Sequence, residues 1–180
     1  MVDCAADPNP ARAAYVEERL GVILKAYTVY LDLWLCDLNG RVIANGRPDL
    51  YRVRGYDASD QPWFSRARAL ATRDHNVAGD LTPLEKHGGA HVATYCARVR
   101  EGGRADGKPI GVLAIHFDWQ PQARAIVTGV RVSGDQRDRT RVMLVDQKGR
   151  VLASSDGRGC LSETINLENQ GQESGWRRNE

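Results

Sequence analysis

Histidine and cysteine side chains are the groups in this 180-residue chain that could bind a metal or haem iron. The candidates are His75, His87, His91, Cys96 and His116, since imidazole and thiolate are the ligands of zinc and haem proteins. No C-x-x-C or H-E-x-x-H spacing occurs, and His87 and His91 are separated by a Gly-Gly pair rather than by a helix. We therefore predict no cofactor, and a haem- or metal-binding sensor that uses His91 and His116 stays the alternative.

Catalytic and nucleic-acid-binding patterns are absent from the sequence. It contains no G-x-S-x-G, Walker or G-x-G-x-x-G motif. The net charge is +2, from 25 basic and 23 acidic residues that are scattered rather than gathered in a basic stripe, which argues against a nucleic-acid partner. No apolar run approaches the ~20 residues that span a bilayer. We expect a binding protein rather than an enzyme, either free of the membrane or cut from a longer membrane protein.

The most apolar stretch of the chain that is typical of a strand runs from Pro109 to Trp119. Its β-branched and aromatic residues predict a strand, and a strand this apolar usually lies at the centre of a sheet. His116 and Asp118 interrupt it and share one face, because side chains alternate along a strand. We therefore expect His116 to point into a ligand pocket and Asp118 to cap the following turn.

Further polar and aromatic residues are candidates for the lining of that pocket. They are Arg54, Tyr56, Asp60, Trp63, Phe64, His91 and Tyr95. Plain structural roles stay open for most of them. Trp63 and Phe64 could fill a core, Asp60 could cap a helix, and His116 could be a satisfied core histidine. His91, Tyr95 and Arg54 could belong to solvated faces.

Periodicity and turn signals place these residues on elements. The predicted elements, in chain order, are a helix from Ala11 to Lys25 or Ala26 with Asn9 as cap, a strand over 28–36, an Asn39-Gly40 turn, a strand over 41–45, a loop over 46–59, a short helix over 65–71 capped by Asp60 or Ser59, an irregular segment over 75–89, a strand over 90–100, the central strand, and a helix over 120–130. Residues 1–10 are expected to be frayed.

The hairpin is repeated near the C-terminus. Residues 143–154 (M-L-V-D-Q-K-G-R-V-L-A-S) match residues 34–45 (W-L-C-D-L-N-G-R-V-I-A-N) without a gap, with the aspartate, glycine, arginine and valine in the same places. Such a repeat indicates a duplicated architecture whose second copy is incomplete here. We predict a first module over 1–130, a linker over 131–140 and the beginning of a second module over 141–180.

The order of these motifs resembles the Cache family of sensor domains, more closely the double Cache region of bacterial chemoreceptors and sensor kinases. The resemblance rests on the helix, the D-x-x-G-x-V-x-A hairpin, the D-x-x-W-F helix start, the G-V-L-A-I strand and the second D-x-x-G-R-V-L-A-S. It implies an α+β, PAS-like fold with a long N-terminal helix and an antiparallel sheet of five to six strands flanked by helices. The ligand would lie between the sheet (90–98 and 110–118) and a cover formed by residues 51–71 and 75–89.

The resemblance also bears on the ligand. Amino-acid sensors of the family use Arg-x-Trp-Tyr in the cover and an aspartate in the central strand, whereas this chain has Gln61, Trp63 and Phe64, and His116 at the aspartate position. We therefore expect an organic acid, a heteroaromatic ring or an uncharged polar metabolite. The family implies a homodimer and a membrane-anchored full-length protein with a downstream signalling domain, its sensor part extracytoplasmic; a cytoplasmic version stays open.

A dimerisation scaffold without ligand is the remaining alternative. The predicted N-terminal helix carries apolar residues at intervals of three and four, which form one apolar face. The residues of this face are Ala13, Val16, Leu20, Ile23, Leu24 and Tyr27. Such a face packs either on the sheet of its own chain or on a second copy of itself.

Overall fold

The structure is a computed structural model that describes residues 1–70, 76–134 and 136–166. Its contacts divide the chain into two units, residues 1–119 (unit 1) and residues 120–180 (unit 2). The predicted module boundaries at residues 130 and 141 stay predictions. None of the described helices is long and apolar enough to cross a membrane.

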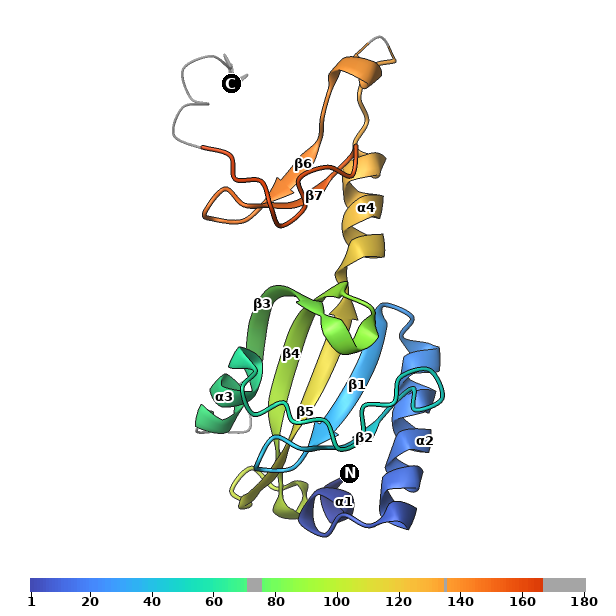
Figure 1. The fold of residues 1–180 in the computed structure, drawn as a ribbon, viewed down its shortest axis with the longest axis vertical. Helices are drawn as coiled ribbons and strands as arrows, with labels where there is room; N and C mark the ends of the chain where they lie inside the picture. Colours follow the sequence, from blue (N-terminus) through green and yellow to red (C-terminus); the bar gives the residue numbers. More distant parts are fainter. Residues whose placement is uncertain (71–75, 135, 167–180) are drawn as a thin grey trace. The chain divides into compact units, whose positions relative to one another are not determined.

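Unit 1 contains a five-stranded antiparallel sheet with the order β2-β1-β5-β4-β3 (Figure 1). The strands are β1 (Tyr30–Cys36), β2 (Val42–Asn45), β3 (Val77–Leu84), β4 (Ala90–Arg100) and β5 (Pro109–Asp118). The apolar stretch is therefore the central strand, as predicted, and the α+β, PAS-like class is confirmed. A short helix, η2 (Glu101–Gly103), lies in the turn between β4 and β5.

The prediction of an irregular segment over 75–89 was wrong. Residue 75 lies outside the described residues, but most of the rest of the segment forms β3 and the short helix η1 (Glu85–His87), and the turn at Gly88 and Gly89 leads into β4. The strand is hard to recognise because Gly79 and Pro83 interrupt it, but it lies at the edge of the sheet, where proline is tolerated.

Two helices cover one face of the sheet. The helix α2 (Pro10–Ala26) begins as predicted, with the Asn9 side chain accepting a hydrogen bond from the backbone N–H of Arg12 at 3.0 Å. Its residues Val16 and Leu20 are buried against β1 and β2 in one apolar core. The face that was a candidate for pairing with a second copy is thus used, for the most part, inside unit 1.

The prediction of a frayed N-terminus was also wrong. Residues Val2–Ala6 form the helix α1. Cys4 and Ala5 of this helix are buried in the same core as α2, so apolar burial holds the segment in place. The Cβ of Ala5 lies 3.2 Å from the position that a Cβ on Gly111 would take, and the glycine therefore lets α1 approach β5.

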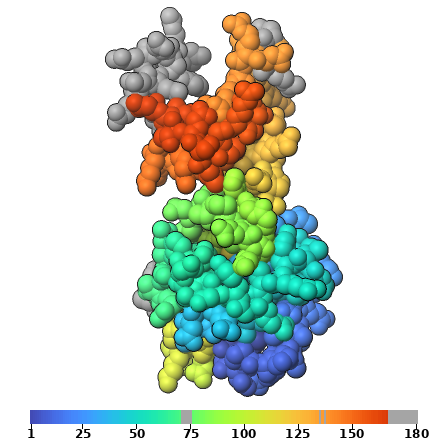
Figure 2. Space-filling model, in the orientation of Figure 1, coloured from blue at the N-terminus to red at the C-terminus, as the bar shows by residue number. Residues whose placement is uncertain are grey.

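The opposite face of the sheet lies under what we call the cover, formed by residues 46–61, the helix α3 (Pro62–Ala69) and η1. Trp63, Phe64 and Ala67 of α3 are buried here together with Trp34 of β1. Figure 2 shows the cover from outside, where its atoms lie in front of the central strands. The cover and the sheet therefore enclose a second core.

Unit 2 contains most of the helix α4 (Trp119–Gly129), the short helix η3 (Arg137–Arg139) and a hairpin of β6 (Met143–Val145) and β7 (Val151–Ser154). The repeat seen in the sequence holds in space, since Met143 pairs with Ser154 in the same register in which Trp34 pairs with Asn45. Residues 167–180, the last part of the predicted beginning of a second module, lie outside the described residues.

Candidate functional site

Three polar side chains form a row across the middle of the unit 1 sheet. Asp32 of β1 is the direct partner of His116 of β5, and His116 is the direct partner of Thr94 of β4. Cross-strand partners project from the same face of a sheet. All three side chains face the cover and are buried, with exposed fractions of 0%, 0% and 2%. A polar row inside an otherwise apolar sheet needs partners from the cover.

Asp32 receives five hydrogen bonds. Its Oδ1 accepts from the backbone N–H groups of Leu33 (2.8 Å) and Gly46 (3.0 Å). Its Oδ2 accepts from Trp34 Nε1 (3.0 Å) and Asn45 Nδ2 (3.0 Å) and contacts His87 Nε2 at 2.9 Å. The carboxylate thus joins β1 to the end of β2 and to η1 in the cover.

The carboxylate of Asp32 is ionised in this environment. Burial acts to raise the pKa of Asp32, but the hydrogen bonds from His87 and Asn45 outweigh this effect and the pKa is lowered from its ordinary value. An ionised carboxylate is only an acceptor, so Nε2 of His87 must carry the proton in their contact. The second ring nitrogen of His87, Nδ1, is buried and has no hydrogen-bond partner among the described residues.

His116 is the least satisfied member of the row. Its Nδ1 lies 3.0 Å from Thr94 Oγ1, while its Nε2 is buried without a hydrogen-bond partner in the described part of the chain. Desolvation lowers the pKa of His116 to about 3, although the charge of Asp32 acts to raise it. The imidazole is therefore neutral near pH 7 and offers an uncharged group for hydrogen bonding.

Aromatic rings surround the row. The ring of Trp34 lies 4.4 Å from that of His116 and 5.8 Å from that of Tyr56, both edge to face. The ring of Trp63 lies 5.8 Å from that of His116, again edge to face, and Tyr51 contacts His87 with 3.7 Å between centroids. We call Asp32, Asn45, His87, Thr94 and His116 the polar cluster; its walls are Trp34, Tyr51, Tyr56 and Trp63.

The structure brings four of the predicted site residues together. His116 belongs to the polar cluster, Tyr56 and Trp63 to its walls, and Phe64 is packed against Trp63 at 6.0 Å between ring centroids. Lys86 of η1 lies over the ring of Tyr56. Burial and the neighbouring acidic groups, Asp60 first, raise the pKa of Tyr56.

Four other predicted residues do not join them. His91 and Tyr95 alternate with the buried Val92 and Thr94, so they lie on the other face of β4, where Tyr95 is 43% exposed. They therefore do not line the same site as His116, because alternation separates the two faces of a strand but does not show which face the cover overlies.

Asp60 and Arg54 lie at the surface of the cover. The predicted cap of α3 was wrong, because Gln61 occupies the N-cap position and no side chain caps the helix. Asp60 is exposed and accepts a hydrogen bond from the side chain of Gln61. Arg54 forms an ion pair with Glu17 of α2, at 2.6 Å from Nη2 to Oε1.

Sequence reasoning did not place Asp32, Asn45, Thr94 or His87 in the pocket, and it considered His87 only as a metal or haem ligand. Asp32 lies within the apolar run Y-L-D-L-W-L-C, and a charge that an apolar strand buries requires a partner; this was the available signal. The identity of the partner was not available from local spacing, since Asp32 and His87 lie 55 residues apart.

The geometry does not join His91 and His116 at one metal. They lie on opposite faces of the sheet, so no ion can contact both side chains. Among the described residues, no group of three His, Cys, Asp or Glu side chains is placed to hold a metal ion. His75 lies outside these residues. The four cysteines are free, and desolvation raises the pKa of Cys96 to about 11, which makes it an inert buried thiol.

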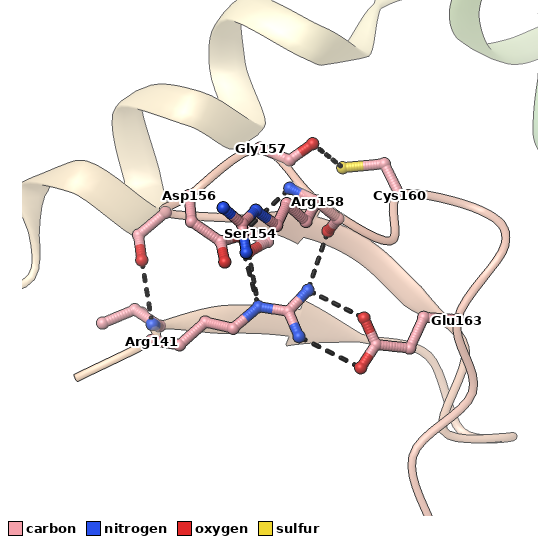
Figure 3. A network of polar contacts seen from close by, with 9 residues as sticks. Arg141, Ser154, Asp156, Gly157, Arg158, Cys160 and Glu163 are labelled. Carbon is pink, nitrogen blue, oxygen red and sulfur yellow. Dashed lines mark hydrogen bonds and ion pairs between the residues drawn. The ribbon is translucent and has the colours of Figure 1, made fainter. Parts of the chain in front are cut away.

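Unit 2 has a different polar centre at the repeated position. Arg141 lies two residues before Met143 of β6, and Asp32 lies two residues before Trp34 of β1. The repeated hairpin therefore has a cation where the first one has an anion. Its guanidinium donates to both carboxylate oxygens of Glu163 (3.0 and 2.8 Å) and to Ser154 Oγ (3.0 Å), as Figure 3 shows. Arg141 therefore ties the segment after the hairpin to the hairpin itself.

Comparisons with known proteins concern the fold. No family model matches the sequence, and no curated protein matches it. Among solved structures, the sensor domain of the Vibrio cholerae histidine kinase DctB is similar over 88% of this chain and 55% of its own, with a TM-score of 0.68 and 19% identity. The ligand-binding domain of the Pseudomonas fluorescens chemoreceptor CtaA, in complex with L-serine, matches 89% of this chain and 61% of its own (TM-score 0.58, 18% identity).

A third structure is the ligand-binding domain of a Campylobacter jejuni chemoreceptor in complex with 4-methylisoleucine, which matches 84% of this chain and 54% of its own (TM-score 0.61, 17% identity). The fold is that of the sensor domains of histidine kinases and chemoreceptors. The chain spans little more than half the length of each of these structures.

Proposed function

We propose that unit 1 is the Cache-type ligand-binding module of a bacterial signal-transduction protein, and that a small metabolite binds between its sheet and its cover. The observation that carries this proposal is His116, a neutral and fully buried imidazole on the central strand whose Nε2 has no partner in the described residues. An unpaired buried polar atom costs about 1–3 kcal/mol, which an apolar residue at this position would avoid. A ligand that hydrogen-bonds to Nε2 gives the histidine a function.

The chemistry of the polar cluster favours some ligands over others. The charged group closest to His116 in the row is the carboxylate of Asp32, which would repel a second carboxylate in this buried environment. The walls are aromatic, and His116 is neutral. Of the classes that the sequence left open, an uncharged polar or heteroaromatic metabolite therefore suits the site better than an organic acid.

Ligand entry requires a movement of the cover, because its aromatic side chains pack against the row. In this proposal η1 moves about the turn that follows it, where Gly88 and Gly89 have φ values of 68° and 76° that favour glycine. A ligand that binds the open form would shift the population toward it. Dimer formation, membrane anchoring, an extracytoplasmic location and a downstream signalling domain stay predictions from the family resemblance.

The experiment is a thermal-shift screen of the purified chain against purines and other heteroaromatics, sugars, polyamines, organic acids and amino acids. A compound that binds the folded state raises the melting temperature by linkage. We expect a hit among the heteroaromatic or uncharged compounds, lost in Trp63→Ala and His116→Ala. Tyr95→Ala, one residue from Thr94 but on the other strand face, should retain it. A shift that survives His116→Ala would contradict the proposal.

A further inference from the structure

A groove lies beside the polar cluster, where α2 approaches the segment after β2. This groove has a volume of about 180 Å³. Its lining residues are Glu17, Asn45, Pro48, Arg52 and Arg54. Arg54, which the sequence marked as a candidate for the pocket lining, thus lies here rather than with Trp63 and His116.

The charges that line the groove leave one cation uncompensated. Nη2 and Nε of Arg54 lie 2.6 and 3.2 Å from Oε1 of Glu17, whose side chain is only 12% exposed, so this pair is neutral as a whole. Arg52 is exposed and forms no hydrogen bond or ion pair with any described residue. The groove therefore carries a net charge of one positive unit, which suits a monoanion.

Asn45 adds a hydrogen-bond acceptor. It is fully buried, and its Nδ2 donates to Oδ2 of Asp32 (3.0 Å) and to the carbonyl of Tyr51 (3.1 Å). These two acceptors define which end of the amide is nitrogen. Its Oδ1 has no hydrogen-bond partner in the described part of the chain, so this oxygen can accept a hydrogen bond from a ligand.

We propose that the groove binds a small hydroxycarboxylate, whose carboxylate pairs with Arg52 and whose hydroxyl donates to Oδ1 of Asn45. The groove is small, about 180 Å³, which favours a ligand of only a few carbons. This site lies beside the polar cluster, shares Asn45 with it, and goes beyond the proposed function. Asn45 also hydrogen-bonds Asp32, so it belongs to both the groove and the polar cluster.

The probes are L-lactate, propionate and propane-1,2-diol, titrated calorimetrically into the full chain at low salt. Propionate lacks the hydroxyl and propanediol lacks the charge, while the size stays nearly the same. We expect lactate to bind roughly tenfold or more tightly than either, because each analogue leaves one buried or charged group unpaired. Equal binding of lactate and propionate, or no binding of lactate, would overturn the proposal.

Variants identify the groove as the site. Arg52→Gln should weaken lactate binding roughly tenfold, while Arg19→Gln, which removes an exposed arginine of α2 outside the groove, should leave it unchanged. Glu17→Gln frees the charge of Arg54 and should strengthen binding. His116→Phe should leave lactate binding unchanged, so failure here and failure of the proposed function are distinguishable. Loss in His116→Phe, equal loss in both arginine variants, or weaker binding in Glu17→Gln would each refute the groove as the site.

Discussion

Replacing Asp32 with asparagine perturbs the group that joins the sheet to the cover. Whichever way the amide is oriented, its NH2 group meets donors: Trp34, Asn45 and His87 on one side, or the backbone N–H groups of Leu33 and Gly46 on the other. At least two buried donors lose their acceptor, at about 1–3 kcal/mol each. The hydrogen bonds that Asp32 accepts are charge-assisted, so each is worth more than a bond between neutral groups. We therefore expect Asp32→Asn to destabilise unit 1 by about 3 kcal/mol or more.

The assay is urea unfolding followed by tryptophan fluorescence at pH 7. Asp60→Asn, an exposed carboxylate of the cover, is the matched control and should change the free energy of unfolding by less than ~0.5 kcal/mol. A loss below ~1 kcal/mol in Asp32→Asn would refute the role of this carboxylate.

The pH dependence gives a second test of the same group. A pKa that is lowered in the folded state stabilises the protein above the unfolded value of ~3.9, and the effect is lost as the pH falls through the folded pKa. The difference between wild type and Asp32→Asn should therefore shrink below pH ~4. A constant difference down to pH 3 would contradict the pKa direction.

Three further perturbations have defined outcomes. The pKa of His116 lies at about 3 in the folded state, whereas the unfolded value is ~6.5. The free energy of unfolding of the wild type should therefore fall as the pH drops from ~6.5 to 3, by up to ~1.4 kcal/mol per pH unit more than that of His116→Gln. Urea midpoints at several pH values measure this difference. Gly46→Ala would place a Cβ 2.4 Å from Cδ1 of the buried Leu24 and should cost about 1–3 kcal/mol in thermal unfolding. Arg141→Gln breaks the pair with Glu163, which is partly exposed, and should cost ~1 kcal/mol and speed hydrogen exchange at the N–H of Val151.

Each of the three has an outcome that would contradict it. Equal pH slopes in His116→Gln and wild type would refute a desolvated imidazole. A neutral Gly46→Ala would refute the close packing of α2 on β2, and Gly129→Ala, whose Cβ meets nothing within 4 Å, is its control. Unchanged exchange at Val151 in Arg141→Gln would show that the network in unit 2 does not hold the segment after the hairpin.

Much of the fold was predictable because local signals agreed with tertiary structure. The helix α2 has its cap at Asn9 and its proline at the first turn, and β5 is a continuous apolar run, so both were found close to their observed bounds. The strand β3 was missed because Gly79 and Pro83 interrupt its pattern. Its place in the sheet depends on pairing with β4, which local propensity does not encode.

The candidate site was predictable only in part. His116 and Trp63 could be found because each is unusual in its own segment, a polar residue in an apolar strand and a tryptophan at a helix start. His87 could not, since its role depends on a contact with Asp32 from a distant strand. The face of β4 that forms the site could not be predicted either, as Tyr95 shows. Alternation separates the two faces of the strand, but the position of the cover decides which of them forms a site.

The central claim is that a ligand reaches the imidazole of His116. Long-range proton–nitrogen NMR spectra of the histidine rings, recorded with and without a compound from the screen, test it directly. We predict that the ring nitrogens of His116 shift on binding, because Nε2 gains a hydrogen bond, while those of His91 on the other strand face stay unchanged. Saturating binding that leaves the His116 nitrogens in place would contradict the account.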